Sequence, residues 1–236
     1  MGPAGHIPDR VWSVNLDPET YSGGYMKRFV PIVLALALVM AFAPRAEAQR
    51  STVRLGLTGG ASTSSVGGDY FSVGDWKWGG VAGVFGQYHV ARQTYVGLDA
   101  NWVQKGGKRV GFSAGSTQDL NLEYIEIPLT IGYVNRFSDW ESNLYIGIAI
   151  AFQISCKVVP TGTSASTDCD DVSLLASKKT TDWSIPFGFG FARNLGGSLL
   201  GIDIRYLLGL SDIFENSNIK NRSWQFTAKW AVPIGN

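Results

Sequence analysis

Apolar residues recur at every second position along most of the chain, in segments separated by polar, glycine-rich stretches. The clearest segment is residues 142–155, SNLYIGIAIAFQIS, in which the apolar set from Leu144 to Ile154 alternates with a small or polar set from Tyr145 to Ser155. Successive side chains of a strand point to opposite faces of its sheet, so this alternation predicts a β-strand with one apolar side.

Seven further segments follow the same design, although residues 77–90 mix apolar residues with glycine on both faces. The seven are residues 52–60, 77–90, 94–103, 124–133, 183–192, 199–210 and 223–234. Eight strands joined in chain order predict an all-β fold, an eight-stranded antiparallel β-barrel with up-and-down meander topology.

The apolar faces of these segments are continuous, whereas the opposite faces carry glycine, alanine, serine and a few charges. A soluble barrel turns its apolar face inward. Small residues instead suit the narrow interior of an eight-stranded barrel, and a continuous apolar exterior suits lipid. The pattern therefore predicts a transmembrane barrel, which satisfies its backbone hydrogen bonds by closure. The alternative is a soluble periplasmic ligand-binding barrel, which requires the apolar faces to point inward.

The connections between the segments alternate in length. The short ones are residues 91–93, 135–142 and 193–197, and the long ones are residues 62–76, 106–119, 157–180 and 211–222. Outer-membrane barrels have short periplasmic turns and longer external loops. With the N-terminus in the periplasm, every short connection is periplasmic and every long one is external, which predicts the cell outer membrane as the location.

A leader precedes the strands in residues 26–49, MKRFVPIVLALALVMAFAPRAEAQ. A basic start, an apolar run over residues 29–42 and the small-x-small sequence before Gln49 make a secretory signal peptide. The run is shorter than the about 20 apolar residues of a membrane-spanning helix. We predict a signal peptide over residues 26–48, cleaved between Ala48 and Gln49.

The leader begins 25 residues into the chain, so residues 1–25 are interpreted as upstream sequence translated from a start assigned too early. A genuine N-terminal extension is the alternative. The barrel domain is predicted over residues 49–236, which is 236 − 48 = 188 residues and enough for one barrel.

Composition and charge agree with a small barrel. The chain has 29 glycines, which disfavour helices at roughly 1 kcal/mol each relative to alanine but suit strongly curved strands. Its net charge of +1 gives no electrostatic reason to expect nucleic acid as a partner.

Cys156 and Cys169 are the only cysteines in the chain. An exported protein meets an oxidising compartment, so the pair predicts one disulfide. The bridge would close part of the longest external loop and stabilise the protein by about 3 kcal/mol in the loop-entropy account. A stiffened loop suits contact with an extracellular or envelope protein, and equally suits protection against proteases.

Three acidic and three basic residues lie on the small, polar faces. They are Arg54, Asp99, Glu126, Asp203, Arg205 and Lys229. Buried charges persist only when they are paired, and an eight-stranded barrel is just filled by side chains. We therefore predict a network of ion pairs that fills the lumen. The alternative is a polar constriction through which ions or small solutes pass, as in a small or gated pore.

No catalytic, cofactor or metal site is predicted. His89 is the only histidine after the leader and lies before a periplasmic turn, whereas catalytic residues of outer-membrane enzymes sit at the external rim. Asp168, Asp170 and Asp171 are interpreted as a solvated acidic loop rather than a calcium site.

Membrane contacts are expected at both ends of the strands. Most tryptophans fall near strand ends, as in the aromatic girdles of membrane barrels: Trp76, Trp78, Trp102, Trp140, Trp183, Trp224 and Trp230. The expected partners are outer-membrane lipid and lipopolysaccharide, whose phosphates the basic stretch at residues 106–111 would meet. The barrel is expected to be a monomer.

Residues 122–133, LEYIEIPLTIGY, resemble the "YlEIPlllky" signature of the PorT-like outer-membrane barrels. The resemblance extends over the layout of leader and strands, and implies an eight-stranded, OmpA/OmpX-like barrel in a Gram-negative envelope. One departure is the end of the sequence, VPIGN, where many outer-membrane barrels have a terminal aromatic residue. The expected function is non-enzymatic, either structural or in surface interaction through the external loops.

Overall fold

The computed structural model describes residues 53–67, 75–113, 116–160, 165–171, 179–213 and 220–234. The predicted upstream segment (residues 1–25), the signal peptide (residues 26–48) and the cleavage site between Ala48 and Gln49 lie outside the described residues and stay predictions. In the described part of the chain, no helix is long and apolar enough to cross a bilayer.

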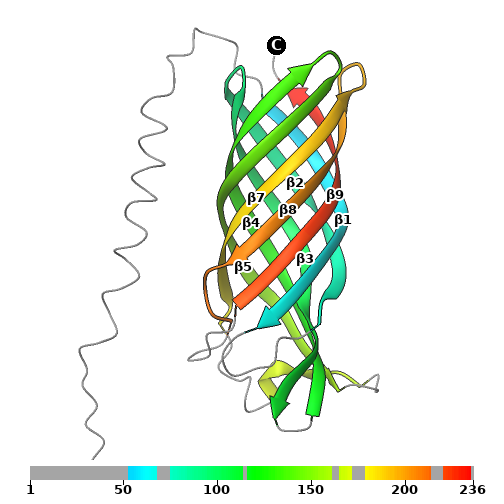
Figure 1. The fold of residues 1–236 in the computed structure, drawn as a ribbon, viewed down its shortest axis with the longest axis vertical. Coiled ribbons are helices and arrows are strands. Elements are labelled where there is room, and N and C mark those ends of the chain that lie inside the picture. The colour runs from blue at the N-terminus through cyan, green and yellow to red at the C-terminus, as the bar shows by residue number, and fades with distance from the viewer. Residues whose placement is uncertain are drawn as a thin grey trace, which may run out of the picture. The chain divides into compact units, whose positions relative to one another are not determined.

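The described residues form antiparallel strands and one short 3₁₀ helix, η1 (Cys169–Asp171). The strands are β1 (Val53–Gly67), β2 (Lys77–Ala91), β3 (Thr94–Ser113), β4 (Ser116–Phe137), β5 (Trp140–Pro160), β6 (Thr167–Asp168), β7 (Thr181–Asn194), β8 (Leu199–Gly209) and β9 (Lys220–Ile234). Eight of them close into a ring in the order β4-β3-β2-β1-β9-β8-β7-β5, with β5 returning to β4 (Figure 1). The two-residue β6 adds to the outer part of β5. The predicted eight-stranded meander barrel is confirmed.

The apolar faces of the strands point outward. Ile148 on β5 is 55% exposed, whereas its neighbour Ala149 faces the interior and is 1% exposed. The same division holds around the ring, where Leu57, Leu98 and Ile202 are exposed. The alternative of a soluble barrel with an apolar interior is therefore wrong, because the side chains that would have to line its ligand cavity face outward.

Several strands are longer than predicted. Residues 106–119, expected as an external loop, are mostly the paired ends of β3 and β4, which project beyond the ring at the lower end of Figure 1. β5 also continues to Pro160 and β1 to Gly67, into residues expected as loops. At the opposite end, the turn expected over residues 135–142 shrinks to Ser138 and Asp139.

Candidate functional site

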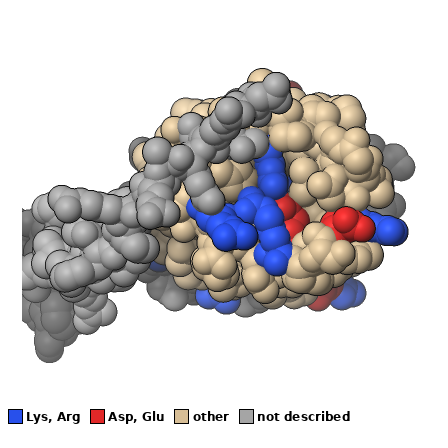
Figure 2. All heavy atoms as spheres, turned by 90° about the horizontal axis from the view of Figure 1, so that it is seen from above, with Lys and Arg blue, Asp and Glu red and all other residues tan. Residues whose placement is uncertain are grey.

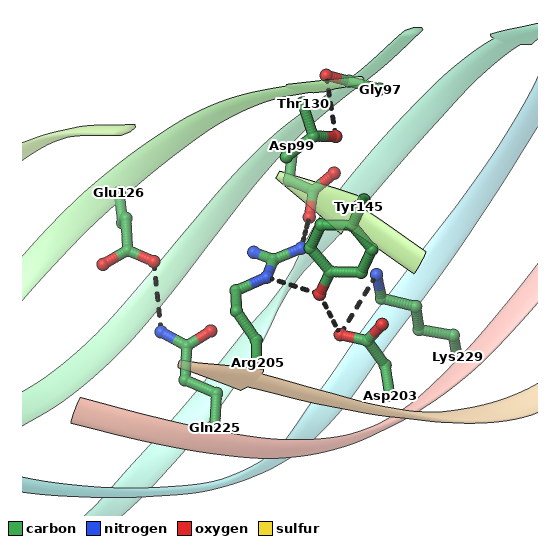
Figure 3. Close-up of polar contacts among 9 residues, drawn as sticks. All are labelled: Gly97, Asp99, Glu126, Thr130, Tyr145, Asp203, Arg205, Gln225 and Lys229. Atoms are coloured by element: carbon green, nitrogen blue, oxygen red, sulfur yellow. Dashed lines mark hydrogen bonds and ion pairs between the residues drawn. The ribbon is translucent and has the colours of Figure 1, made fainter. Parts of the chain in front are cut away.

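An ion pair between β8 and β3 lies buried inside the barrel (Figure 3). Arg205 Nη2 lies 2.5 Å from Asp99 Oδ2, and the two side chains are 4% and 5% exposed. Arg205 Nε also donates a hydrogen bond of 2.9 Å to the hydroxyl oxygen of Tyr145 on β5. Three strands from different parts of the ring are thus joined across the lumen through one guanidinium.

Tyr145 connects this pair to a second one. Its hydroxyl donates to Asp203 Oδ1 at 2.7 Å, and Lys229 Nζ on β9 lies 3.5 Å from the same carboxylate oxygen (Figure 3). The Lys229 ammonium also lies 5.0 Å from the centre of the Phe85 ring on β2, within cation–π range. We call these five polar residues (Asp99, Tyr145, Asp203, Arg205 and Lys229) the central network.

Two further ion pairs lie inside the barrel on either side of the central network, one between the neighbouring strands β3 and β4 and one across the lumen between β1 and β5. Toward the long-loop end, Lys105 Nζ lies 2.5 Å from Glu126 Oε2, and Gln225 Nε2 donates to Glu126 Oε1 at 3.1 Å. Toward the short-turn end, the Arg54 guanidinium binds the Glu141 carboxylate through two hydrogen bonds of 2.6 and 3.0 Å. Such bidentate arginine–carboxylate pairs are among the stronger charge-assisted hydrogen bonds.

All six charged residues predicted for the lumen lie inside the barrel, but they do not pair only with one another. Four of them join the central network, whereas Glu126 and Arg54 have as partners Lys105 and Glu141, which the sequence analysis did not select. Both partners lie an even number of positions from inward-facing residues of the same strand, Lys105 from Asp99 on β3 and Glu141 from Tyr145 on β5. Extending that alternation by a few positions past each predicted strand end would have found them.

The inward face changes character beyond the ion pairs, at the long-loop end. On β4, Leu120, Leu122 and Tyr124 face inward and are each 1% exposed, while Asp119 and Glu123 face outward. This reverses the arrangement in the membrane-spanning part, where apolar residues face outward. The reversal marks the level at which the strands leave lipid for water.

The inward apolar residues of this region form one buried cluster. It contains Val66, Val110, Leu120, Leu122, Tyr124, Ala151, Cys156, Val158, Cys169 and Ile213. The members come from β1, β3, β4, β5, η1 and the segment after β8. We call the cluster and the strand ends that carry it the outer cap, because it fills the ring at its long-loop end.

The disulfide between Cys156 and Cys169 lies within the outer cap, with its Cα atoms 5.5 Å apart. The bridge holds η1 against β5, next to the pairing of β6 with Lys157 and Val158. Ile213, in the segment after β8, accepts a backbone hydrogen bond of 2.8 Å from the N–H of Lys179, just before β7. This bond joins the two segments. The predicted disulfide is therefore present, and it fixes part of the cap rather than an isolated loop.

Two serines tie β1 directly to β3 under the cap. The buried Ser62 and Ser64 hydroxyls donate to the carbonyl oxygens of Gln104 (2.5 Å) and Gly106 (3.0 Å). Gly106 has φ of 133°, a conformation that favours glycine.

The other residues considered from sequence do not assemble a reactive site. His89 is buried near the short-turn end, with Nδ1 3.4 Å from Arg136 Nη2. Asp168 and Asp171 are exposed, and within the described ranges no group of three or more His, Cys, Asp or Glu residues has an arrangement able to hold a metal ion.

One basic residue of the external hairpin, Arg109, already has anionic partners. Arg109 Nε lies 2.6 Å from Asp75 Oδ2, and its backbone N–H donates to Asp119 Oδ1 at 2.9 Å. Lys108 pairs with Asp75 through the backbone. Arg109 is thereby less available to lipopolysaccharide phosphates.

Exposed aromatic residues form two levels on the outer surface. On β2, the exposed Trp78 and Tyr88 are ten positions apart on the lipid-facing side. A rise of ~3.4 Å per residue and a tilt of ~40° give a separation of about 26 Å along the barrel axis, close to the ~25 Å apolar band of outer-membrane barrels. Trp183 and Trp224 are likewise exposed at the long-loop level, and Trp140 at the short-turn level.

Comparison with known proteins gives distant structural likenesses. No curated protein sequence matches the chain. Its structure is similar to Neisserial surface protein A (12% identity, 78% of this chain and 99% of that chain covered, TM-score 0.46). It is also similar to Ail, the attachment invasion locus protein of Yersinia pestis (14% identity, 76% and 98% covered, TM-score 0.42). These likenesses are too distant to say what the chain binds.

A family model is more informative. The outer membrane protein beta-barrel domain matches residues 33–231, which is most of the chain. This match agrees with the closed ring, the outward apolar band and the aromatic levels described above. The chain belongs to the outer membrane protein beta-barrel domain family, and its place is the outer membrane.

Proposed function

We propose that this protein is a closed, non-enzymatic outer-membrane barrel that presents its outer cap as an interaction surface. The observation that carries the proposal is the filling of the lumen at two levels, by charged pairs in the membrane and by an apolar cluster outside it. Because the lumen is filled at both levels, solutes have no open path through it. The groups that can contact other molecules outside the membrane are therefore those on the surface of the cap.

The charged level supports a closed lumen. The central network joins four strands, because Asp99, Tyr145, Asp203 and Arg205 lie on β3, β5 and β8 and Lys229 lies on β9, where its ammonium also contacts the Phe85 ring on β2. A cavity of about 40 Å³ opens on the short-turn side, lined in part by Arg54 and Lys229. At ~10–15 Å³ for each water, it holds about three waters and ends at the network. This makes the alternative, a small or gated pore, less favourable.

The cap is suited to contact with a partner because it is rigid and polar outside. Its strands are paired with one another, its apolar side chains are buried, and the disulfide fixes its edge. A surface that is ordered before binding loses less conformational entropy on association. The partner class is an extracellular or envelope protein, with lipopolysaccharide as a further contact.

Three finer assignments belong to this proposal. Within its family the chain is PorT-like, which the sequence LEYIEIPLTIGY on β4 supports. The protein works as a monomer. Residues 26–48 are removed after Ala48 during export, which the leader pattern supports.

The surface role is tested by trimming the projecting hairpin. Replacing residues 106–121 with Asn-Gly joins the paired positions Lys105 and Leu122 by a two-residue turn. Cells displaying the full protein are expected to attach to a basement-membrane matrix better than cells displaying the trimmed protein. A gel shift on heating checks that both barrels are folded. Equal attachment by the two proteins contradicts the proposal.

A further inference from the structure

An aromatic cluster lies on the lipid-facing surface at the short-turn end, where β4, β5 and β7 meet. Trp140 stacks on Phe191 with ring centres 4.9 Å apart, and Phe137 packs against Phe191 at 5.9 Å. Phe137 and Trp140 are both exposed. In a membrane barrel such a cluster lies at the level of the lipid headgroups.

Arg193 lies directly on this cluster. It is the cross-strand partner of Trp140, and its guanidinium carbon lies 5.3 Å from the centre of the indole ring. Stacking on an aromatic face holds a guanidinium while leaving its N–H groups free to bind an anion. Arg193 is exposed, and among the residues that the structure describes no carboxylate lies within ion-pair distance of it.

The neighbouring rim is also basic. Arg136, near the end of β4, donates a hydrogen bond to the backbone oxygen of Arg92 in the turn between β2 and β3. These two arginines therefore lie together at the short-turn end. Glu141, the nearest buried acid, is held by Arg54 through both carboxylate oxygens and lies 3.5 Å from Arg136 Nε. Figure 2 looks onto this end of the barrel, where Lys and Arg side chains gather in the central hollow beside fewer Asp and Glu side chains.

We infer that Arg193, held on Trp140, binds the phosphate of an anionic phospholipid in the periplasmic leaflet. A guanidinium forms two parallel hydrogen bonds with a phosphate, and the exposed rings beside it contact the upper part of the acyl chains. Arg92 adds a second positive charge at the same rim. At the opposite end of the barrel, the exposed Arg109 is instead paired with Asp75.

The inference is tested by native mass spectrometry of the detergent-solubilised protein titrated with phosphatidylglycerol. Arg193→Gln is expected to weaken lipid binding about fivefold, the equivalent of ~1 kcal/mol for one basic residue at an anionic surface. Trp140→Leu, which keeps an apolar side chain but removes the ring, is expected to weaken it in the same direction. The matched control is Arg109→Gln, which removes an exposed arginine at the other end and is expected to leave binding unchanged.

Three results overturn the inference. Binding that is unchanged in Arg193→Gln means that the lipid does not bind this arginine, and binding that is weakened equally in Arg109→Gln means that the lipid responds only to overall charge. Displacement of the lipid by millimolar inorganic phosphate means that the site takes free phosphate rather than a headgroup anchored by its acyl chains. Phosphatidylglycerol binding that resists inorganic phosphate and depends on Arg193 supports the site.

Discussion

Removing the guanidinium of Arg205 is the sharpest perturbation of the lumen. Arg205→Met keeps much of the side-chain volume but leaves the Asp99 carboxylate buried without the cation that lies 2.5 Å away. Two unit charges 4 Å apart attract by about 4 kcal/mol at an effective dielectric constant of 20. Breaking a buried pair from one side costs about 3–5 kcal/mol, because one charge stays uncompensated. We therefore expect Arg205→Met to lower the free energy of unfolding by about 3–5 kcal/mol.

The double variant separates pairing from simple loss of volume. Adding Asp99→Leu to Arg205→Met removes the uncompensated carboxylate, so the double variant is expected to be more stable than Arg205→Met alone. The coupling energy between the two positions is expected to be about 2–3 kcal/mol, in the upper part of the range for residues in contact. Arg109→Met is the matched control, because it breaks an exposed ion pair with Asp75 and should cost less than about 1 kcal/mol.

The assay is urea unfolding of the protein refolded into lipid vesicles, followed by tryptophan fluorescence, with linear extrapolation to water. Additive effects of Arg205→Met and Asp99→Leu would refute the reasoning, since independent sites cannot form one network. So would a cost for Arg205→Met no larger than that for Arg109→Met.

Three further predictions address the membrane surface, the cap and the leader. Ile148→Lys is expected to keep the protein out of the membrane fraction, because a lysine facing lipid costs about 2–4 kcal/mol near the bilayer midplane. Ile148→Val is the control, and normal assembly of Ile148→Lys would contradict the outward orientation of this side chain. The double variant Cys156→Ser, Cys169→Ser is expected to keep the heat-dependent gel shift but to make the cap sensitive to trypsin, because it loses about 3 kcal/mol of loop constraint. Unchanged resistance to trypsin would mean that packing alone holds the cap. N-terminal sequencing of the exported protein is expected to begin at Gln49, and any earlier residue disagrees with the predicted cleavage.

The membrane-spanning part of the fold was predictable because one rule governs it throughout. Lipid requires apolar residues on one side of every strand, and the narrow lumen requires small or paired residues on the other. The alternation around Ile148 therefore indicated both the strand and the direction in which its faces point. The same rule selected Asp99 and Arg205, which lie on different strands but face the same lumen.

The outer cap was not predicted because its alternation follows the opposite rule. Leu120, Leu122 and Tyr124 continue the β4 strand, but with their apolar side chains inward and polar residues such as Glu123 outward. Strands that leave the membrane meet water on their outer side, so the polarity of the two faces is exchanged. Under the rule for a lipid-facing strand, the pattern begins only at Tyr124, and residues 106–119 were expected as a loop. In the cap the alternation of apolar and polar residues continues, but the apolar residues change from the outward face to the inward face.

Which inward charges pair with which could not be predicted from sequence. Pairing across the lumen depends on the stagger of strands around the ring, which brings Glu141 to Arg54 although they are 87 residues apart in the chain. Lys105 and Glu141 also lie in residues that were not assigned to strands, so their inward orientation was not considered.

The most direct test of the account is the ion conductance of the barrel, started at Gln49 and refolded into planar lipid bilayers. A gel shift on heating first confirms that the barrel is folded. The account predicts a folded protein with no steady conductance, because the central network and the outer cap both fill the lumen. Steady channels whose ion selectivity changes in Arg205→Met would contradict it, since the charged residues would then line a path for ions.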